Sequence, residues 1–174
     1  NGVSFLERFL PEFEKAEQEF GVPKEIIAAI IGIESSYGSI TGRERVIDSL
    51  STLAFDYPRR SKFFTKQLEH FLLLAREEKL DPLVMKGSYA GAMGYGQFIP
   101  SSYRSYAIDF DDDGVRNIVT NPIDAIGSVA NYLSRHGWER NATIAEALTK
   151  NDVNSNFKTS LSLKEPDALD LVSK

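Results

Sequence analysis

The stretch GVPKEIIAAIIGIESSYG, residues 21–38, places one carboxylate on a helix face that is otherwise apolar. Val22-Pro23 indicates a helix start, and Gly38 indicates a stop. The apolar stripe between them consists of Ile26, Ile27, Ile30, Ile31 and Ile33. Glu34 follows Ile27, Ile30 and Ile31 by seven, four and three residues, so it is expected to project from the face that they occupy.

Burial on such a face would have a chemical consequence for Glu34. A carboxyl group that leaves water favours its neutral form, and this raises its pKa toward the value that a general acid needs near neutral pH. A glutamate near a helix C-terminus also occurs as the partner of a backbone group or an arginine, since buried glutamates are rarely unpaired. The helix alone leaves both roles open.

The composition is that of an ordinary globular protein, and it excludes several functions. The 174 residues are 42% hydrophobic and 26% charged, which is enough for one core or two small lobes. The net charge of −5 provides no basic stripe for phosphates, so nucleic acid is not an expected partner. The absence of cysteine excludes disulfides and thiolate ligands. No apolar run of about 18 residues occurs, so the sequence predicts no transmembrane segment.

Apolar residues at helical spacing predict further helices on both sides of the central stretch. They cover residues 4–20, a segment from Val46 to the stop at Tyr57-Pro58, residues 61–79, and the residues that follow Asn121-Pro122. Pro11 is expected to bend or restart the first of these helices, because a proline in a helix interior removes a hydrogen bond. The last helix carries Tyr132 on its flank.

Residues 87–100, GSYAGAMGYGQFIP, differ from these helices because four glycines occur within ten residues. Such a run permits close approach of the backbone to another group. One interpretation is a tight packing loop between helices. The other is the wall of a cleft, in which Ser88, Tyr95 and Gln97 orient a ligand through a few hydrogen bonds. The segment alone does not decide between the two.

The acidic turn DFDDDG, residues 109–114, matches the beginning of a calcium-binding EF-hand loop. Positions 1, 3, 5 and 6 of that loop are occupied by Asp109, Asp111, Asp113 and Gly114. Val115 would contribute its carbonyl oxygen. Position 12 holds Thr120 in place of glutamate, and the next acid is Asp124. The pattern favours calcium over magnesium because the oxygen ligands are numerous, and a solvated acidic turn is the alternative.

Four stretches, taken in order, resemble the catalytic domain of lytic transglycosylases of the membrane-bound B type, glycoside hydrolase family 103. They are GVPKEIIAAIIGIESSYG, DSLSTLAFDYPRR, FLLLAREEKLDPLVMKGSYAGAMGYGQFIPSSYRSYAIDF and NPIDAIGSVANYLSRHGW, and they lie between residues 21 and 138. GSYAGAMGYGQFIPSSY is a very specific motif. The resemblance implies a mainly α, lysozyme-like fold of the goose-type and lytic transglycosylase kind, with an EF-hand-like calcium loop.

The same resemblance implies cleavage of the β-1,4 bond between N-acetylmuramic acid and N-acetylglucosamine in peptidoglycan, with a 1,6-anhydromuramic acid end as product. It puts the single catalytic acid, which later acts as base, on Glu34. Ordinary glycosidases need two carboxylates, and the motif region offers no second acid that the family pattern assigns as nucleophile. The alternatives are a hydrolytic lysozyme-like muramidase and a non-catalytic peptidoglycan-binding module.

The resemblance also implies the remaining site residues. Substrate-binding roles fall on Ser88, Gln97 and Tyr132, and the cleft interpretation adds Tyr95. A structural calcium ion would be held by Asp109, Asp111, Asp113, the carbonyl oxygen of Val115, and Asp124. No organic cofactor is expected.

Three parts are expected along the chain: an N-terminal helical packing segment over residues 1–20, a lysozyme-like catalytic domain over 21–138 with its calcium loop at 109–124, and a helical and polar tail over 139–174. The tail does not match the aromatic-rich C-terminal segment of the family. The expected partner is the glycan strand of peptidoglycan, and a monomer is expected. The expected location is the periplasm or cell envelope of a bacterium, with a lipidated N-terminus outside this sequence as a possible anchor.

Overall fold

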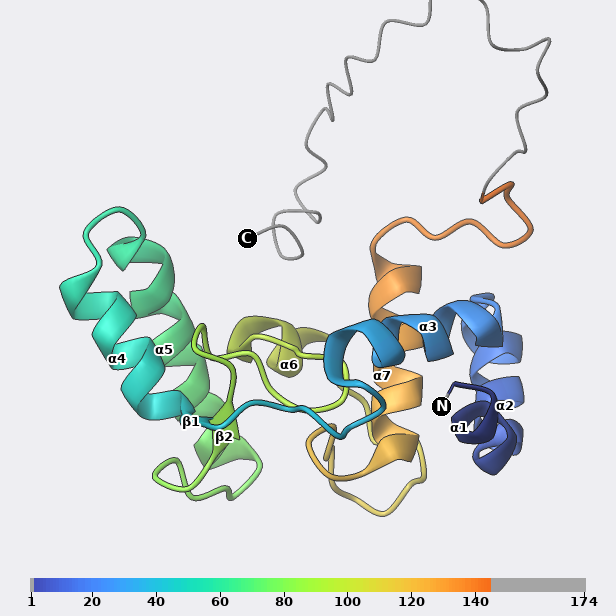
Figure 1. Cartoon of the computed structure of the whole chain (residues 1–174), viewed down its shortest axis with the longest axis horizontal. Coiled ribbons are helices and arrows are strands. Elements are labelled where there is room, and N and C mark those ends of the chain that lie inside the picture. The colour runs from blue at the N-terminus through green and yellow to red at the C-terminus, as the bar shows by residue number, and fades with distance from the viewer. Residues whose placement is uncertain (1, 145–174) are drawn as a thin grey trace, which may run out of the picture. The chain divides into compact units, whose positions relative to one another are not determined.

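The computed structural model describes residues 2–144, which are mainly helical as expected (Figure 1). Asn1–Trp138 form one compact unit, to which the chain from Glu139 onward does not belong. The elements are α1 (Gly2–Arg8), α2 (Leu10–Phe20), α3 (Lys24–Ser35), β1 (Glu44–Arg45), α4 (Val46–Asp56), α5 (Ser61–Glu77), β2 (Lys86–Gly87), α6 (Pro100–Tyr106) and α7 (Pro122–Arg135). Within the described range, no helix combines the length and the apolar character needed to cross a membrane. The tail expected to be helical lies, from residue 145 onward, outside the described residues.

The helix expected over residues 4–20 divides into α1 and α2 at Phe9. Pro11 lies in the first turn of α2, where its missing N–H breaks no helical hydrogen bond. The expected restart at Pro11 is therefore confirmed. Phe13 and Ala16 of α2 are fully buried, and α2 packs against both α3 and α7.

α3 carries Glu34 and buries only one side. Ile27 and Ile31 are fully buried, whereas Ile33 is 75% exposed. The prediction that Ile33 belongs to the buried stripe is wrong, because it lies about 200° around the helix from Ile31. The helix begins at Lys24, directly after Pro23, and it ends at Ser35 before the expected stop at Gly38.

α4 and α5 run side by side (Figure 1). Just before α4, the short strand β1 pairs antiparallel with β2, so that Glu44 lies opposite Gly87. This pairing brings the chain that follows α3 to the beginning of the glycine-rich segment 87–100.

α7 begins where Asn121-Pro122 predicts it. The Asn121 side chain accepts a hydrogen bond from the backbone N–H of Ile123 at 3.0 Å, and Pro122 lies in the first turn. Farther along the helix, a Cβ added at Gly127 would collide with the Phe110 ring. The glycine therefore allows α7 to pack directly on the acidic turn that contains Phe110.

Candidate functional site

Glu34 lies in the last turn of α3, and its side chain is half-buried. Burial raises the pKa of its carboxyl group above the ordinary value of 4.5, and no charged group or hydrogen bond contributes to the shift. Among residues 2–144, none forms a hydrogen bond or an ion pair with this carboxylate. Glu34 is therefore not the paired helix glutamate that its sequence position also allowed. Its position near the negative end of a helix favours the protonated form further.

Ser35, the next residue, joins α3 to the glycine-rich segment. Its hydroxyl donates to the carbonyl oxygen of Tyr95 at 2.7 Å and accepts from the N–H of Gly38 at 3.0 Å. Sequence reasoning missed Ser35. A signal was available, because Ser35 follows the buried Ile31 by four residues and so lies on the same helix face.

Residues 87–100 pack closely on the chain that follows α3, as one of the two interpretations predicted. A Cβ at Gly42 would collide with the backbone of Gly87. The ring of Tyr95 covers Gly38 so closely that a Cβ there would collide with it, and the same ring stacks on Phe5 with centroids 6.3 Å apart. The ring of Tyr95 therefore contributes to packing within this region.

Ser88 and Gln97 each keep one polar function that the described residues do not use. The Ser88 hydroxyl oxygen accepts from the N–H groups of Ala90 and Ala92 at 3.3 and 3.1 Å, which leaves its O–H able to donate. The Gln97 amide nitrogen donates to the carbonyl oxygens of Gly94 and Thr41 at 2.9 and 3.3 Å. This orientation leaves the Gln97 amide oxygen as an acceptor.

Tyr132 on α7 lies against the same segment. Its ring centroid is 5.5 Å from that of Phe98, 5.2 Å from that of Tyr106 and 4.0 Å from that of His136. Burial raises the pKa of the Tyr132 phenol. Direct contacts thus connect the segment that contains Ser88, Tyr95 and Gln97 both to Tyr132 and to the end of α3.

A separate hollow of about 210 Å³ lies elsewhere on this unit. Its lining consists of Pro11, Glu12, Lys15, Phe110, Asp111 and Ile123. None of the residues expected to bind substrate belongs to that lining, so the hollow adds nothing to the site around Glu34.

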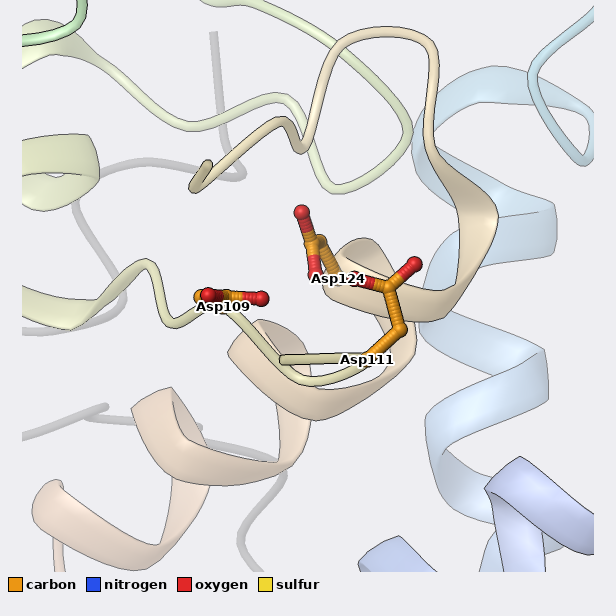
Figure 2. Close-up of side chains that lie close together, drawn as sticks. All are labelled: Asp109, Asp111 and Asp124. Carbon is orange, nitrogen blue, oxygen red and sulfur yellow. The ribbon is translucent and has the colours of Figure 1, made fainter. Parts of the chain in front are cut away.

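Three aspartates converge beside the start of α7. Asp109, Asp111 and Asp124 each present a carboxylate oxygen, and these atoms lie within 4.8 Å of one another (Figure 2). The carboxylate of the fully buried Asp124 accepts from the N–H groups of Phe110 at 2.8 Å and Asn117 at 2.7 Å. Because Asp124 lies on α7, the packing of α7 on Phe110 fixes the distance between Asp124 and the acidic turn.

Asp113, also expected as a ligand, is not part of this cluster. Its carboxylate accepts from the N–H of Val115 at 2.8 Å, while its own N–H donates to Asp109 at 3.1 Å. Asp109 accepts a second backbone N–H from Gly114 at 2.8 Å. The turn therefore uses Asp113 to shape the loop, and Val115 takes part through its N–H in this arrangement.

The electrostatics of the cluster suit a cation. Burial raises the pKa of Asp124, two backbone N–H groups oppose the rise, and the nearby Asp111 and Asp109 add to it. No lysine or arginine within residues 2–144 forms an ion pair with any of the three. A hard divalent cation among these oxygens would relieve both the desolvation and the repulsion between like charges.

Comparison with known proteins agrees with this geometry. Residues 1–170 match the family described as the transglycosylase SLT domain. The chain belongs to this family. The resemblance to lytic transglycosylases seen in the sequence is thereby confirmed.

Within the transglycosylase SLT family, the chain is similar to membrane-bound lytic murein transglycosylase B of Escherichia coli, with 53% identity over 83% of this chain and 40% of that protein. It also resembles the Escherichia coli lytic transglycosylase Slt35 solved in complex with calcium, with a TM-score of 0.80 and 53% identity over 82% of this chain and 46% of that one. A third relative is SltB3 of Pseudomonas aeruginosa, solved with NAG-NAM-pentapeptide. Its TM-score is 0.77 with 40% identity, over 81% of this chain and 37% of that one.

These likenesses confirm the expected lytic transglycosylase fold. The chain spans less than half the length of these relatives.

Proposed function

We propose that this transglycosylase SLT domain cleaves the glycan strands of peptidoglycan at the β-1,4 bond between N-acetylmuramic acid and N-acetylglucosamine. The observation that carries the proposal is the Glu34 carboxyl group. It is half-buried, unpaired among the described residues and raised in pKa. Family membership supports the assignment of this reaction to a single carboxyl group, and relatives named as lytic murein transglycosylases support the choice of substrate.

One carboxyl group is enough for the proposed reaction. Protonated Glu34 first gives its proton to the glycosidic oxygen as the bond from C1 to that oxygen breaks. The Glu34 carboxylate then takes the proton of the substrate's own C6 hydroxyl while O6 forms a bond to C1. The 1,6-anhydro ring closes, Glu34 is protonated again, and no water is consumed.

The other predicted residues would orient the sugar. The Ser88 hydroxyl has a proton to donate, and the Gln97 amide oxygen can accept from a sugar hydroxyl or amide. Tyr95 and Tyr132 contribute the aromatic parts of the same region. A pocket with few polar groups among apolar ones fixes the orientation of its ligand in this way.

Mass spectrometry of the products of purified glycan strands tests the proposal. Release of 1,6-anhydromuramic acid ends supports it. Products with reducing ends would indicate a hydrolytic muramidase, and intact strands would indicate a binding module.

We further propose that Asp109, Asp111 and Asp124 hold a structural calcium ion. Their oxygens converge, Asp124 is fully buried, and a relative was solved in complex with calcium. The ion would stabilise the connection between the acidic turn and α7 and would take no part in the chemistry at Glu34.

The substrate places the proposed site of action in the bacterial cell envelope. A relative described as membrane-bound supports this location. Labelling of surface-accessible proteins in intact and permeabilised cells, with this chain in its full-length protein, tests it.

A further inference from the structure

Ser35 is the buried polar residue closest in sequence to Glu34. The residue is 1% exposed. The hydroxyl oxygen lies 2.7 Å from the carbonyl oxygen of Tyr95 and 3.1 Å from that of Ile31. One hydroxyl has one proton to donate, and the shorter distance favours Tyr95. Ser35 therefore forms a bridge from the end of α3 to a residue 60 positions farther along the chain.

The turn after α3 is held in part by the same side chain. Ser36, Tyr37 and Gly38 have φ angles of 49°, 59° and 82°. This left-handed conformation is unfavourable for residues with a Cβ, so the surrounding structure must hold Ser36 and Tyr37 in it. Ser35 helps to hold them through two hydrogen bonds. Its side-chain hydroxyl accepts from the N–H of Gly38 at 3.0 Å, and its backbone carbonyl oxygen accepts from the N–H of Ile40 at 2.8 Å.

The other end of the bridge leads directly to Gln97. Tyr95 precedes Gln97 by two residues, and Gln97 itself has a left-handed φ of 48°. Its amide nitrogen donates to the carbonyl oxygen of Thr41, which follows the turn after α3. Two contacts, Ser35 to Tyr95 and Gln97 to Thr41, therefore hold the turn against the glycine-rich segment.

We propose that Ser35 is a positioning residue, whose hydroxyl fixes Glu34 relative to Gln97 through the Tyr95 carbonyl group. The inference rests on the proposed function. Proton transfer requires the Glu34 carboxyl group to reach the glycosidic oxygen while the segment of Gln97 holds the sugar. A misplacement of about 1 Å costs roughly 100-fold in rate. Ser35 does not touch the substrate in this proposal.

The test compares Ser35→Ala with Ser128→Ala, in excess calcium, on purified glycan strands. Ser128 is a matched control: it is fully buried, and its hydroxyl oxygen accepts from the N–H of Ile108 at 2.9 Å. Both changes should lower the melting temperature. Only Ser35→Ala should lower kcat, by roughly 10- to 100-fold, with little change in KM. An equal loss of kcat in both variants overturns the proposal.

The pH profile supplies a second readout. General acid catalysis needs protonated Glu34, so the rate should fall as the pH rises through the pKa of this group. Loss of the Ser35 bridge should admit water to the Glu34 carboxyl group and lower its pKa. The falling limb of the profile, where the rate decreases as the pH rises, should therefore move to lower pH. Among the described residues no charged group sets that pKa, so Ser128→Ala should leave the limb in place.

Ser35→Cys places a weak hydrogen-bond donor at the same position, and it replaces Ser35→Ala in the test if that variant does not fold. It should show the same changes to a smaller extent. A folded Ser35→Ala or Ser35→Cys variant with the wild-type kcat and the wild-type limb overturns the proposal. Failure of the proposed function is a different result, because the wild type itself would then release no anhydro product.

Discussion

At the scale of single residues, Glu34 and Asp124 respond to burial in the same direction but have different surroundings. Burial raises the pKa of both carboxyl groups. Two backbone N–H groups donate to Asp124 and partly stabilise its charged form, whereas the two neighbouring aspartates destabilise it. A bound cation would relieve that repulsion. No described residue stabilises the charged form of Glu34. Burial therefore shifts Glu34 toward its neutral form relative to an exposed glutamate, in the direction that a proton donor requires.

Glu34→Gln should abolish turnover while the protein still folds. The amide keeps the size of the side chain but cannot give up or take a proton at the working pH. Each step of general acid or base catalysis contributes roughly 10² to 10⁴ in rate, so the loss should reach several orders of magnitude. Product release from glycan strands, followed by mass spectrometry, measures it. A variant that still forms anhydro ends at a comparable rate would remove Glu34 from the catalytic role.

The same variant should change the pH dependence of stability. The folded state raises the pKa of Glu34, so between the unfolded and the folded pKa it binds more protons than the unfolded state does. The favourable contribution is fully present below the unfolded pKa, and it is lost as the pH rises through the folded pKa. Glu34→Gln removes this loss, so its melting temperature relative to wild type should increase with pH across that window. A difference that does not change with pH contradicts the prediction.

Gln97→Ala should reduce activity on the order of 100-fold, because it removes a hydrogen bond to the sugar that strengthens in the transition state. The variant also loses the bonds to Gly94 and Thr41, so a stability measurement must accompany the assay. Gln97→Asn is the matched control for the backbone, since asparagine tolerates the left-handed conformation found here. An unchanged rate for Gln97→Ala on purified glycan strands would exclude Gln97 from substrate binding.

At the scale of elements, helical periodicity predicted the longer helices because buried stripes such as those of α2, α5 and α7 repeat at helical spacing, but it did not predict the short α6. It predicted Glu34 as a candidate for the same reason. The inclusion of Ile33 in the buried stripe was wrong, because Ile33 is apolar but lies on the opposite side of the helix from Ile31. Residues 87–100 could not be interpreted from their own sequence. Their contacts, such as Ser35 with Tyr95, join positions far apart in the chain.

Gly42→Ala should separate the chain that follows α3 from the glycine-rich segment 87–100. Gly42 has a φ of 101°, and a Cβ there would collide with the backbone of Gly87. Gly137→Ala is the matched control, since Gly137 has a φ of 89° and nothing within 4 Å of the added Cβ. Conformational strain of about 1–2 kcal/mol should affect both variants, and only Gly42→Ala should lose more stability and also activity. Urea unfolding and the glycan assay measure the two effects, and equal losses contradict the prediction.

At the scale of the whole molecule, the three-aspartate cluster joins the acidic turn to α7. The family resemblance suggested four aspartate ligands, but the structure brings three of them together. The sequence pattern places alternate aspartates in a turn, yet it does not show that Asp113 bonds to the backbone of Val115. Nor does it show that Gly127 lets α7 approach Phe110. These details depend on packing between elements.

Calcium should stabilise the entire fold, because the cluster joins the turn at Asp109 and Asp111 to Asp124 on α7. A ligand at about 100 times its dissociation constant adds roughly 2.7 kcal/mol to the free energy of unfolding. For a chain of this size, that corresponds to an increase in melting temperature of roughly 5 to 11 °C between chelator and saturating calcium.

Asp111→Ala should abolish the increase. Asp113→Ala, the matched control, should retain most of it, since Asp113 lies outside the cluster. Scanning calorimetry with calcium or chelator measures all three proteins. Identical melting of the wild type in both solutions would exclude a calcium site here, and equal losses in the two variants would restore Asp113 to the ligand set.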